Sequence, residues 1–149
     1  MSTYYFITSE LNGHVMDIKG ASTDAGTPII NYPRKSSGTE NQLWMLDAQE
    51  NGYFFVVSQL NGNVLDVDGA NKGAGTQLIS YPRKTAGTDN QLWSIEPAGD
   101  SKSFFLVSKL NGYVADVKGG DTGDLTPVIN YPRKSSGTNN QRWRLVPAG

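Results

Sequence analysis

Residues 41–44 read Asn-Gln-Leu-Trp, and this stretch returns as Asn-Gln-Leu-Trp at 90–93 and as Asn-Gln-Arg-Trp at 140–143. Other patterns recur around it at nearly the same spacing. Leu-Asn-Gly begins at residues 11, 60 and 110 (60−11 = 49 and 110−60 = 50), and Tyr-Pro-Arg-Lys begins at residues 32, 81 and 131. A fixed period of this kind indicates structural repeats. We therefore expect one domain over residues 1–149, built from three copies at about 1–49, 50–98 and 99–149.

Each copy contains short apolar or alternating runs separated by turn residues, which is typical of β-strands. In the first copy these runs cover residues 4–8, 14–18, 28–31 and 42–46. Leu11-Asn12-Gly13 predicts a hairpin with a type I′ turn, because Asn and Gly tolerate positive φ. No apolar period of 3.6 is sustained, so we expect twelve strands in a closed all-β body. Three propeller blades would be fewer than propellers use.

The composition excludes several functions. Thirteen basic against fourteen acidic residues give a net charge of −1, so no global field favours nucleic acid or an anionic membrane. The absence of Cys excludes disulfides and thiolate metal sites. The start, Met1 to Tyr4, lacks the features of a signal peptide, and no run is long enough to span a bilayer. We expect a cytoplasmic protein that is released when cells are damaged, without cofactor, metal or membrane insertion.

The repeated tripeptides resemble the Q-x-W motif of the ricin B-type (R-type) β-trefoil lectins, and so do the Asp-Ile or Asp-Val pairs 25 residues upstream (42−17, 91−66 and 141−116). The resemblance covers nearly the whole chain, and the sequence is most similar to the cysteine-free lectins of fungal fruiting bodies. It implies a β-trefoil of twelve strands in three pseudo-symmetric repeats. These motifs are Gln42-Leu43-Trp44, Gln91-Leu92-Trp93 and Gln141-Arg142-Trp143.

Trp44, Trp93 and Trp143 are expected in the core, because a large ring repeated by internal symmetry most simply packs around a shared axis. The aspartates are different, because a carboxylate within an apolar strand needs hydrogen-bond partners. Either backbone amides and a nearby glycine turn satisfy it, which makes it a loop stabiliser, or it accepts hydrogen bonds from two sugar hydroxyls. We favour the second interpretation.

The resemblance also implies which residues bind the sugar. A tyrosine fifteen residues after each aspartate is the expected platform for a pyranose, although it could simply cover the rim of the core. The asparagine before each Gln is expected to bond a hydroxyl. The complete candidate set is Asp17, Gly20, Tyr32, Asn41 and Gln42 in the first copy, Asp66, Gly69, Tyr81, Asn90 and Gln91 in the second, and Asp116, Gly119, Tyr131, Asn140 and Gln141 in the third.

Two features qualify this interpretation. The position two before each tyrosine, often polar in the family, is Ile30, Ile79 or Ile129, so a sugar contact is expected to be missing. The repeated Pro-Arg-Lys could bind sulfated glycans, contact the rim of larger glycans or be solvated turn charge, and threefold symmetry argues against a single basic patch. No nucleophile, zinc or paired-carboxylate pattern indicates an enzyme.

The resemblance implies a multivalent lectin for β-galactose or N-acetylgalactosamine on glycoproteins and glycolipids, with one shallow site in each repeat. Such a protein would agglutinate cells, including erythrocytes, and would serve defence. Two alternatives stay open at this point: a trefoil that inhibits a protease through one distinctive loop, and a polysaccharide-binding module of the xylan type. A homodimer also stays open.

Overall fold

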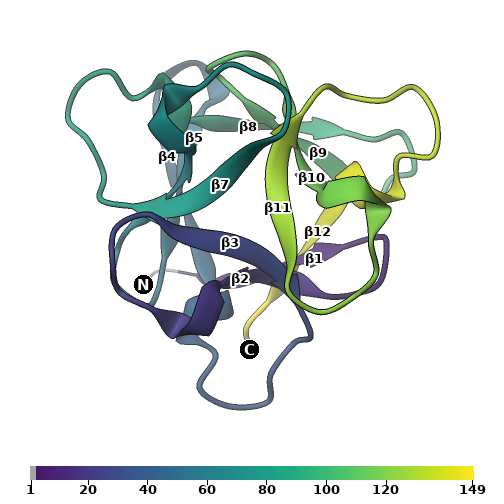
Figure 1. Ribbon diagram of the computed structural model, residues 1–149, viewed down its shortest axis with the longest axis horizontal. Coiled ribbons are helices and arrows are strands. Elements are labelled where there is room, and N and C mark those ends of the chain that lie inside the picture. The colour runs from purple at the N-terminus through teal and green to yellow at the C-terminus, as the bar shows by residue number, and fades with distance from the viewer. Residues whose placement is uncertain (1–2) are drawn as a thin grey trace.

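The computed structural model describes residues 3–149 and consists of strands joined by turns (Figure 1). Met1 and Ser2, part of the start on which the cytoplasmic expectation rests, lie outside the described residues. The strands are β1 (Tyr5–Ser9), β2 (Val15–Ile18), β3 (Thr27–Tyr32), β4 (Trp44–Ala48), β5 (Phe54–Ser58), β6 (Val64–Val67), β7 (Thr76–Tyr81), β8 (Trp93–Pro97), β9 (Phe104–Ser108), β10 (Val114–Val117), β11 (Thr126–Tyr131) and β12 (Trp143–Pro147). The expectation of an all-β fold with twelve strands is confirmed.

Helical structure within residues 3–149 is limited to 3₁₀ turns of three residues. These turns are η1 (Lys19–Ala21), η2 (Glu40–Gln42), η3 (Glu50–Gly52), η4 (Asp68–Ala70), η5 (Asp89–Gln91), η6 (Lys118–Gly120) and η7 (Asn139–Gln141). No helix in this part of the chain is long and apolar enough to cross a membrane.

Six strands close into a barrel through antiparallel pairing. β1 pairs with β12, β4 with β5 and β8 with β9, each over five residue pairs. Single pairs between β1 and β4, β5 and β8, and β9 and β12 complete the ring. Because the ring closes, the barrel leaves no unpaired sheet edge.

Three hairpins cover one end of the barrel. β2 pairs with β3, β6 with β7 and β10 with β11, each over four residue pairs. β3, β7 and β11 also pair with one another and form the triangle at the centre of Figure 1. Gln77 holds the triangle together, because its Nε2 donates to the carbonyls of Ile29, Leu78 and Val128 at 2.7–3.0 Å.

The core draws on strands from the whole chain. Trp44, Trp93 and Trp143 are completely buried in one hydrophobic cluster with aliphatic and aromatic residues of the barrel and hairpins. Each indole Nε1 donates to a backbone carbonyl at 3.0–3.2 Å, so the N–H groups of all three tryptophans have a partner. The prediction that these tryptophans are core residues is confirmed.

Two local predictions were wrong. The fourth strand of the first copy begins at Trp44 rather than Gln42, because residues 40–42 form a 3₁₀ turn that directs the Gln42 side chain back toward the protein interior. The first hairpin is present, but its turn is not type I′, because Gly13 has positive φ and Asn12 does not. Instead, Asn12 Oδ1 accepts a hydrogen bond from His14 N at 3.0 Å.

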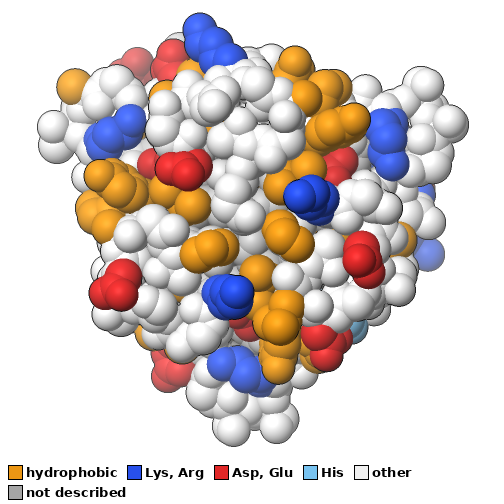
Figure 2. All heavy atoms as spheres, in the orientation of Figure 1, with side chains coloured by type: hydrophobic (Ala, Val, Ile, Leu, Met, Phe, Trp, Pro, Cys, Tyr) orange, Lys and Arg blue, Asp and Glu red, His pale blue; other side chains and the backbone are white. Residues whose placement is uncertain are grey.

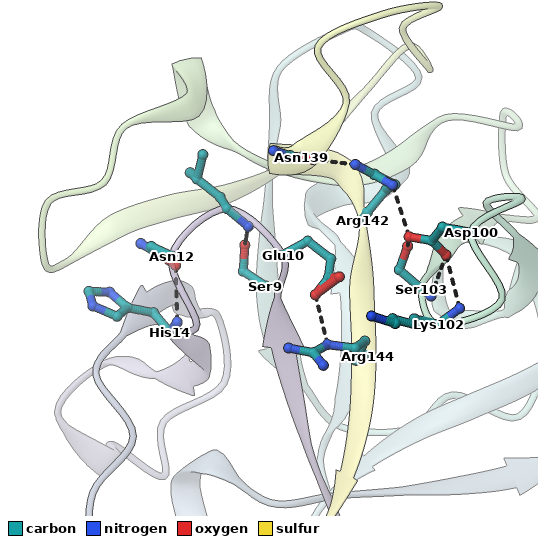
Figure 3. Close-up of polar contacts among 11 residues, drawn as sticks. Ser9, Glu10, Asn12, His14, Asp100, Lys102, Ser103, Asn139, Arg142 and Arg144 are labelled. Carbon is teal, nitrogen blue, oxygen red and sulfur yellow. Dashed lines mark hydrogen bonds and ion pairs between the residues drawn. The ribbon is translucent and has the colours of Figure 1, made fainter.

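The third copy departs from the others beside β12. Leu43 and Leu92 pack in small clusters with phenylalanine and valine, but the equivalent residue is Arg142. Arg142 contacts Asp100 at 3.0 Å and Asn139, and Asp100 in turn accepts a hydrogen bond from Ser103 Oγ at 2.7 Å (Figure 3). Hydrogen bonds from the Ser103 hydroxyl and from the backbone N–H groups of Ser103 and Lys102 lower the pKa of the Asp100 carboxyl below its ordinary value, and the charge of Arg142 acts in the same direction. A polar network thus replaces an apolar contact.

Candidate functional site

Three pockets open beside the three hairpins, with volumes of about 410, 300 and 450 Å³ in chain order. These volumes fall at the small end of the range for ligand pockets. Each pocket is lined by the predicted Asp, Gly, Tyr and Asn of its own copy, together with an isoleucine and a lysine: Asp17, Gly20, Ile30, Tyr32, Lys35 and Asn41; Asp66, Gly69, Ile79, Tyr81, Lys84 and Asn90; Asp116, Gly119, Ile129, Tyr131, Lys134 and Asn140.

The aspartates sit at the base of the pockets, in the short strands β2, β6 and β10. Their exposed fractions are only 2–3%, yet every carboxylate is hydrogen-bonded. In the first pocket Asp17 Oδ1 accepts from Asn41 Nδ2 at 3.2 Å and Oδ2 accepts from Gln42 Nε2 at 2.9 Å. The other two copies repeat both bonds within 0.1 Å.

Burial raises the pKa of all three pocket aspartates, because the charged form loses its hydration. The Gln and Asn hydrogen bonds and the nearby lysine act in the opposite direction but are outweighed. Side-chain amides satisfy these carboxylates, so the alternative in which backbone amides of the glycine turn do so is not what the structure shows. A buried carboxylate at the base of a pocket is a strong acceptor for sugar hydroxyls.

Each asparagine donates a hydrogen bond to the carboxylate and accepts one from a lysine. Both N–H groups of Asn41 are used, one for Asp17 and one for the carbonyl of Ile18 at 3.0 Å. Its Oδ1 accepts from Lys35 Nζ at 2.6 Å, and the same bond occurs at 2.6 Å in the other copies. A sugar hydroxyl could therefore donate to Asn Oδ1 but has no Asn donor left to accept from.

The lysines were not predicted as site residues, although they recur with the aspartates at a constant distance. Each places an ammonium group, a donor only, in a pocket whose carboxylate is an acceptor only. A hydroxyl both donates and accepts, so it can bond to either group. The neighbouring arginines lie elsewhere: Arg34, Arg83 and Arg133 stack on Phe6, Phe55 and Phe105 at 3.9–4.0 Å. The Pro-Arg-Lys repeat is therefore split between packing and the pocket.

The glutamines do not reach the pockets. Gln42, Gln91 and Gln141 are completely buried and line none of the three. In the first copy, Gln42 Nε2 also donates to the carbonyl of Pro33 and Oε1 accepts from the backbone N–H of Lys35, both at 3.0 Å. Their hydrogen-bonding groups are thus occupied, and the predicted ligand contact is replaced by a role in positioning the aspartate and the lysine-bearing loop.

The predicted glycines form the rim of each pocket. Gly20, Gly69 and Gly119 have φ between +62° and +66°, in the middle of a 3₁₀ turn. A Cβ at these positions would meet no atom within 4 Å, so the requirement for glycine comes from the backbone conformation and not from crowding. The turn carries the chain directly from the aspartate strand around the pocket.

The tyrosines and isoleucines supply apolar walls. Tyr81 and Tyr131 are 40% exposed, which suits a stacking platform, whereas Tyr32 is less exposed and is half-buried. The isoleucines are nearly buried but line the pockets, so an apolar side chain occupies the position that is often polar in the family, and the loss of a sugar contact there stays a prediction. The adjacent Asn31 points away from the pocket and bonds to Asn12 Oδ1 at 3.1 Å. Figure 2 shows orange hydrophobic side chains beside blue basic ones around this face.

The three pockets differ in charge and in one wall. Lys19 and Lys118 line the first and third pockets, whereas the second has Asp68 at the same position. The first pocket also contains Leu125, which comes from the third copy. In residues 3–149, no group of three or more His, Cys, Asp or Glu side chains could hold a metal ion. Each pocket thus offers a carboxylate that accepts hydrogen bonds, an ammonium group that donates them and an apolar tyrosine face.

Comparison with known proteins shows the family of this chain. The family model for "Ricin-type beta-trefoil lectin domain-like" proteins matches residues 1–81, 40–131 and 89–149, which together span the chain. The chain belongs to this family. Among curated proteins no significant match was found.

Several solved structures share this ricin-type lectin fold. The designed threefold-symmetric protein ThreeFoil is 36% identical, with a TM-score of 0.86 over 96% of this chain and 97% of that one. 1,3Gal43A, an exo-β-1,3-galactanase from Clostridium thermocellum, is 29% identical with a TM-score of 0.87, but the match covers 98% of this chain and only 30% of the galactanase. The Rhizoctonia solani agglutinin is 22% identical, with a TM-score of 0.80 over 99% of this chain and 96% of that one.

Proposed function

We propose that this ricin-type lectin domain is a multivalent lectin for glycans with terminal β-galactose or N-acetylgalactosamine, with three pseudo-symmetric repeats that each carry one shallow site. The observation that supports this best is the threefold recurrence of one pocket. Its carboxylate, amide and ammonium groups keep the same partners in every copy, with corresponding distances that differ by no more than 0.1 Å. The same polar groups therefore line a pocket in every copy.

The pocket chemistry suits a pyranose. Two adjacent hydroxyls can share the carboxylate and lysine, and the tyrosine can stack on the apolar face of the ring. Stacking is worth about 1 kcal/mol by analogy with aromatic pairs, and each hydrogen bond to a charged group is worth about 1.5–3 kcal/mol. One such site is weak, but several on one rigid body raise avidity by roughly 10²–10⁴ on a multivalent surface. Agglutination of cells and a defensive role follow as proposals.

The galactosyl specificity is supported by the 29% identity to part of an exo-β-1,3-galactanase. The same likeness favours a second candidate function, a module that binds β-1,3-galactan. This would replace the xylan-type module as the polysaccharide alternative. The cytoplasmic location, the absence of catalysis and the assembly as monomer or homodimer stay predictions.

Glycan binding tests the proposal directly. On a glycan array, β-galactosides and N-acetylgalactosaminides should bind, and replacing Tyr32, Tyr81 and Tyr131 by Ala should remove the signal. Tyr113→Ala is the matched control, because Tyr113 is partly exposed, as Tyr32 is, but lines none of the three pockets. Both proteins should keep the melting temperature of the parent within a few degrees.

Each outcome on the array has a meaning. Binding that requires long β-1,3-galactan chains, without binding of terminal galactosides, supports the module instead of the lectin. Signal on xylan alone refutes the galactosyl proposal. Silence on all glycans from a folded protein refutes the lectin and leaves the protease-inhibitor alternative, which inhibition assays would then examine.

A further inference from the structure

Leu125 has a left-handed backbone conformation, and the residues at the two equivalent positions with this conformation are glycines. Gly26 and Gly75, which precede β3 and β7, have φ of +89° and +90°, and Leu125, which precedes β11, has φ of +67°. This left-handed region is unfavourable for leucine, because its Cβ crowds the backbone. The side chain is also 52% exposed, so burial does not compensate. Neither packing nor local conformation explains a leucine at this position.

These three residues lie against the neighbouring repeat. Gly26 N donates to the carbonyl of Ser80 in β7, and Gly75 N donates to that of Asn130 in β11, both at 2.8 Å. Thr126, the residue after Leu125, pairs with Asn31 of β3. The strands β11 and β3 lie side by side in Figure 1. Leu125 therefore belongs to the third repeat but borders the pocket of the first, as Gly75 borders the pocket of the third.

The first pocket differs accordingly. Its tyrosine, Tyr32, is half-buried and therefore less exposed than Tyr81 and Tyr131. Leu125 lines the same pocket as Tyr32 and Ala21, so this pocket has an added apolar wall where the others have glycine or open space. A Cβ at Gly26 or Gly75 would meet no atom within 4 Å, so room for such a wall exists in the other copies but is not used.

We propose that Leu125 makes the first pocket selective for a sugar with an apolar substituent, namely an N-acetylated hexosamine over the unsubstituted hexose. The proposal rests on the proposed lectin function and specifies the ligand of one of its three sites. Residues in strained conformations persist mainly where a site uses them. The acetamido methyl is an apolar group of the size of one methyl, and covering it against Leu125 should strengthen binding about fourfold, or about 0.8 kcal/mol.

Nuclear magnetic resonance can measure the three sites separately in the intact protein. The backbone amides of Gly20, Gly69 and Gly119 lie one in each pocket and serve as reporters. Titrations with methyl β-galactoside and with methyl N-acetyl-β-galactosaminide give a dissociation constant for each sugar at each site. We expect the preference for the N-acetylated sugar to be about fourfold greater at Gly20 than at the other two reporters.

Two substitutions test the role of Leu125. Leu125→Gly should reduce the preference at Gly20 to that of the other sites without lowering the melting temperature, because a strained residue is replaced by one that tolerates the conformation. Gly75→Leu should create the preference at Gly119. Asp124→Ala, an exposed neighbour that does not line the first pocket, is the control and should change neither ratio.

The outcomes separate this inference from the function on which it rests. Sugar-dependent shifts at all three glycines with equal preferences, unchanged in Leu125→Gly, overturn the role of Leu125 and leave the lectin proposal standing. A lack of shifts at every reporter with either sugar overturns both. If Leu125→Gly instead changes the oligomeric state and not the preference, Leu125 serves an interface, and the selectivity proposal is wrong.

Discussion

Replacing a pocket aspartate by alanine should separate ligand binding from folding, and Asp116→Ala shows the reasoning. Its Oδ2 accepts from Gln141 Nε2 at 2.8 Å and its Oδ1 from Asn140 Nδ2 at 3.2 Å. After the change each amide keeps one partner, the carbonyl of Val117 at 3.1 Å for Asn140 and that of Pro132 at 2.9 Å for Gln141. Neither nitrogen is left without a hydrogen bond.

The expected loss of stability is therefore moderate. Two hydrogen bonds to a charged group contribute about 1.5–3 kcal/mol each. The raised pKa of Asp116 shows that burial of its charge outweighs these bonds and the nearby lysine in the balance between its two protonation states. Removing the carboxyl group also removes that penalty, so we expect a net loss of about 1–2 kcal/mol and a melting temperature lower by about 2–8 °C.

The effect on binding should be larger. A sugar that gives two hydroxyls to the carboxylate loses about 3 kcal/mol or more, which is at least about a hundredfold at that site. Thermal melting measures the first effect, and a titration read at the Gly119 amide measures the second, with Asp24→Ala as control, because Asp24 is exposed and lines none of the three pockets. Full affinity at Gly119 in the folded variant would refute the carboxylate's role in binding. Failure to fold would support the alternative in which the aspartate is purely structural.

Three other predictions concern pH, pocket charge and the third copy. Burial raises the pKa of the pocket aspartates, so their contribution to stability is fully present below about pH 3.8 and is lost as pH rises through the raised folded pKa. Sugar affinity needs the charged carboxylate and is therefore lost as pH falls through the same pKa. Binding calorimetry and thermal melting from pH 7 to 4 should show these opposite trends, and parallel trends would contradict them. Asp68→Lys should strengthen binding of galacturonic acid at the Gly69 reporter about two- to tenfold at low salt, with the gain falling at high salt, and an unchanged affinity would show that this charge does not face the ligand. Arg142→Leu should raise the free energy of unfolding in a urea titration by about 1 kcal/mol, because the leucine would be buried and the unpaired, buried Nε of Arg142 would be removed. A decrease in the free energy of unfolding would show that the contact between Arg142 and Asp100 contributes more.

The fold was predictable because its signals are local and repeated. Trp44 and its counterparts recur with strand-like runs and turn residues at one period, and three-copy closure buries them. Strand limits were less predictable. Gln42 reads as part of an apolar strand run, but its hydrogen bonds to Asp17 and Pro33 hold it in a turn, and such long-range partners are not visible in a linear pattern.

The pockets were predictable only in part. The Asp, Tyr and Asn positions came from a family pattern and lie together. The lysine was missed because it follows an arginine in the sequence, and the two basic residues have different surroundings in the structure. A recurring lysine at a fixed distance from each aspartate was the available signal. Leu125 could not be assigned to the first pocket from its own repeat, because the contact depends on how one repeat lies against the next.

The pairing of β1 with β12 has a consequence for biosynthesis. Tyr5 lies opposite Pro147 and Ser9 opposite Trp143, so the first strand of this domain has its main partner in the last strand of the domain. Until that strand emerges, β1 has only single-residue ladder contacts with β2 and β4, and the ring stays open. Such distant pairing slows folding and exposes strand edges in the nascent chain. Early structure in the growing polypeptide therefore comes from hairpins between neighbouring strands, namely β2–β3, β4–β5, β6–β7, β8–β9 and β10–β11, and the ring closes only after translation has passed residue 147.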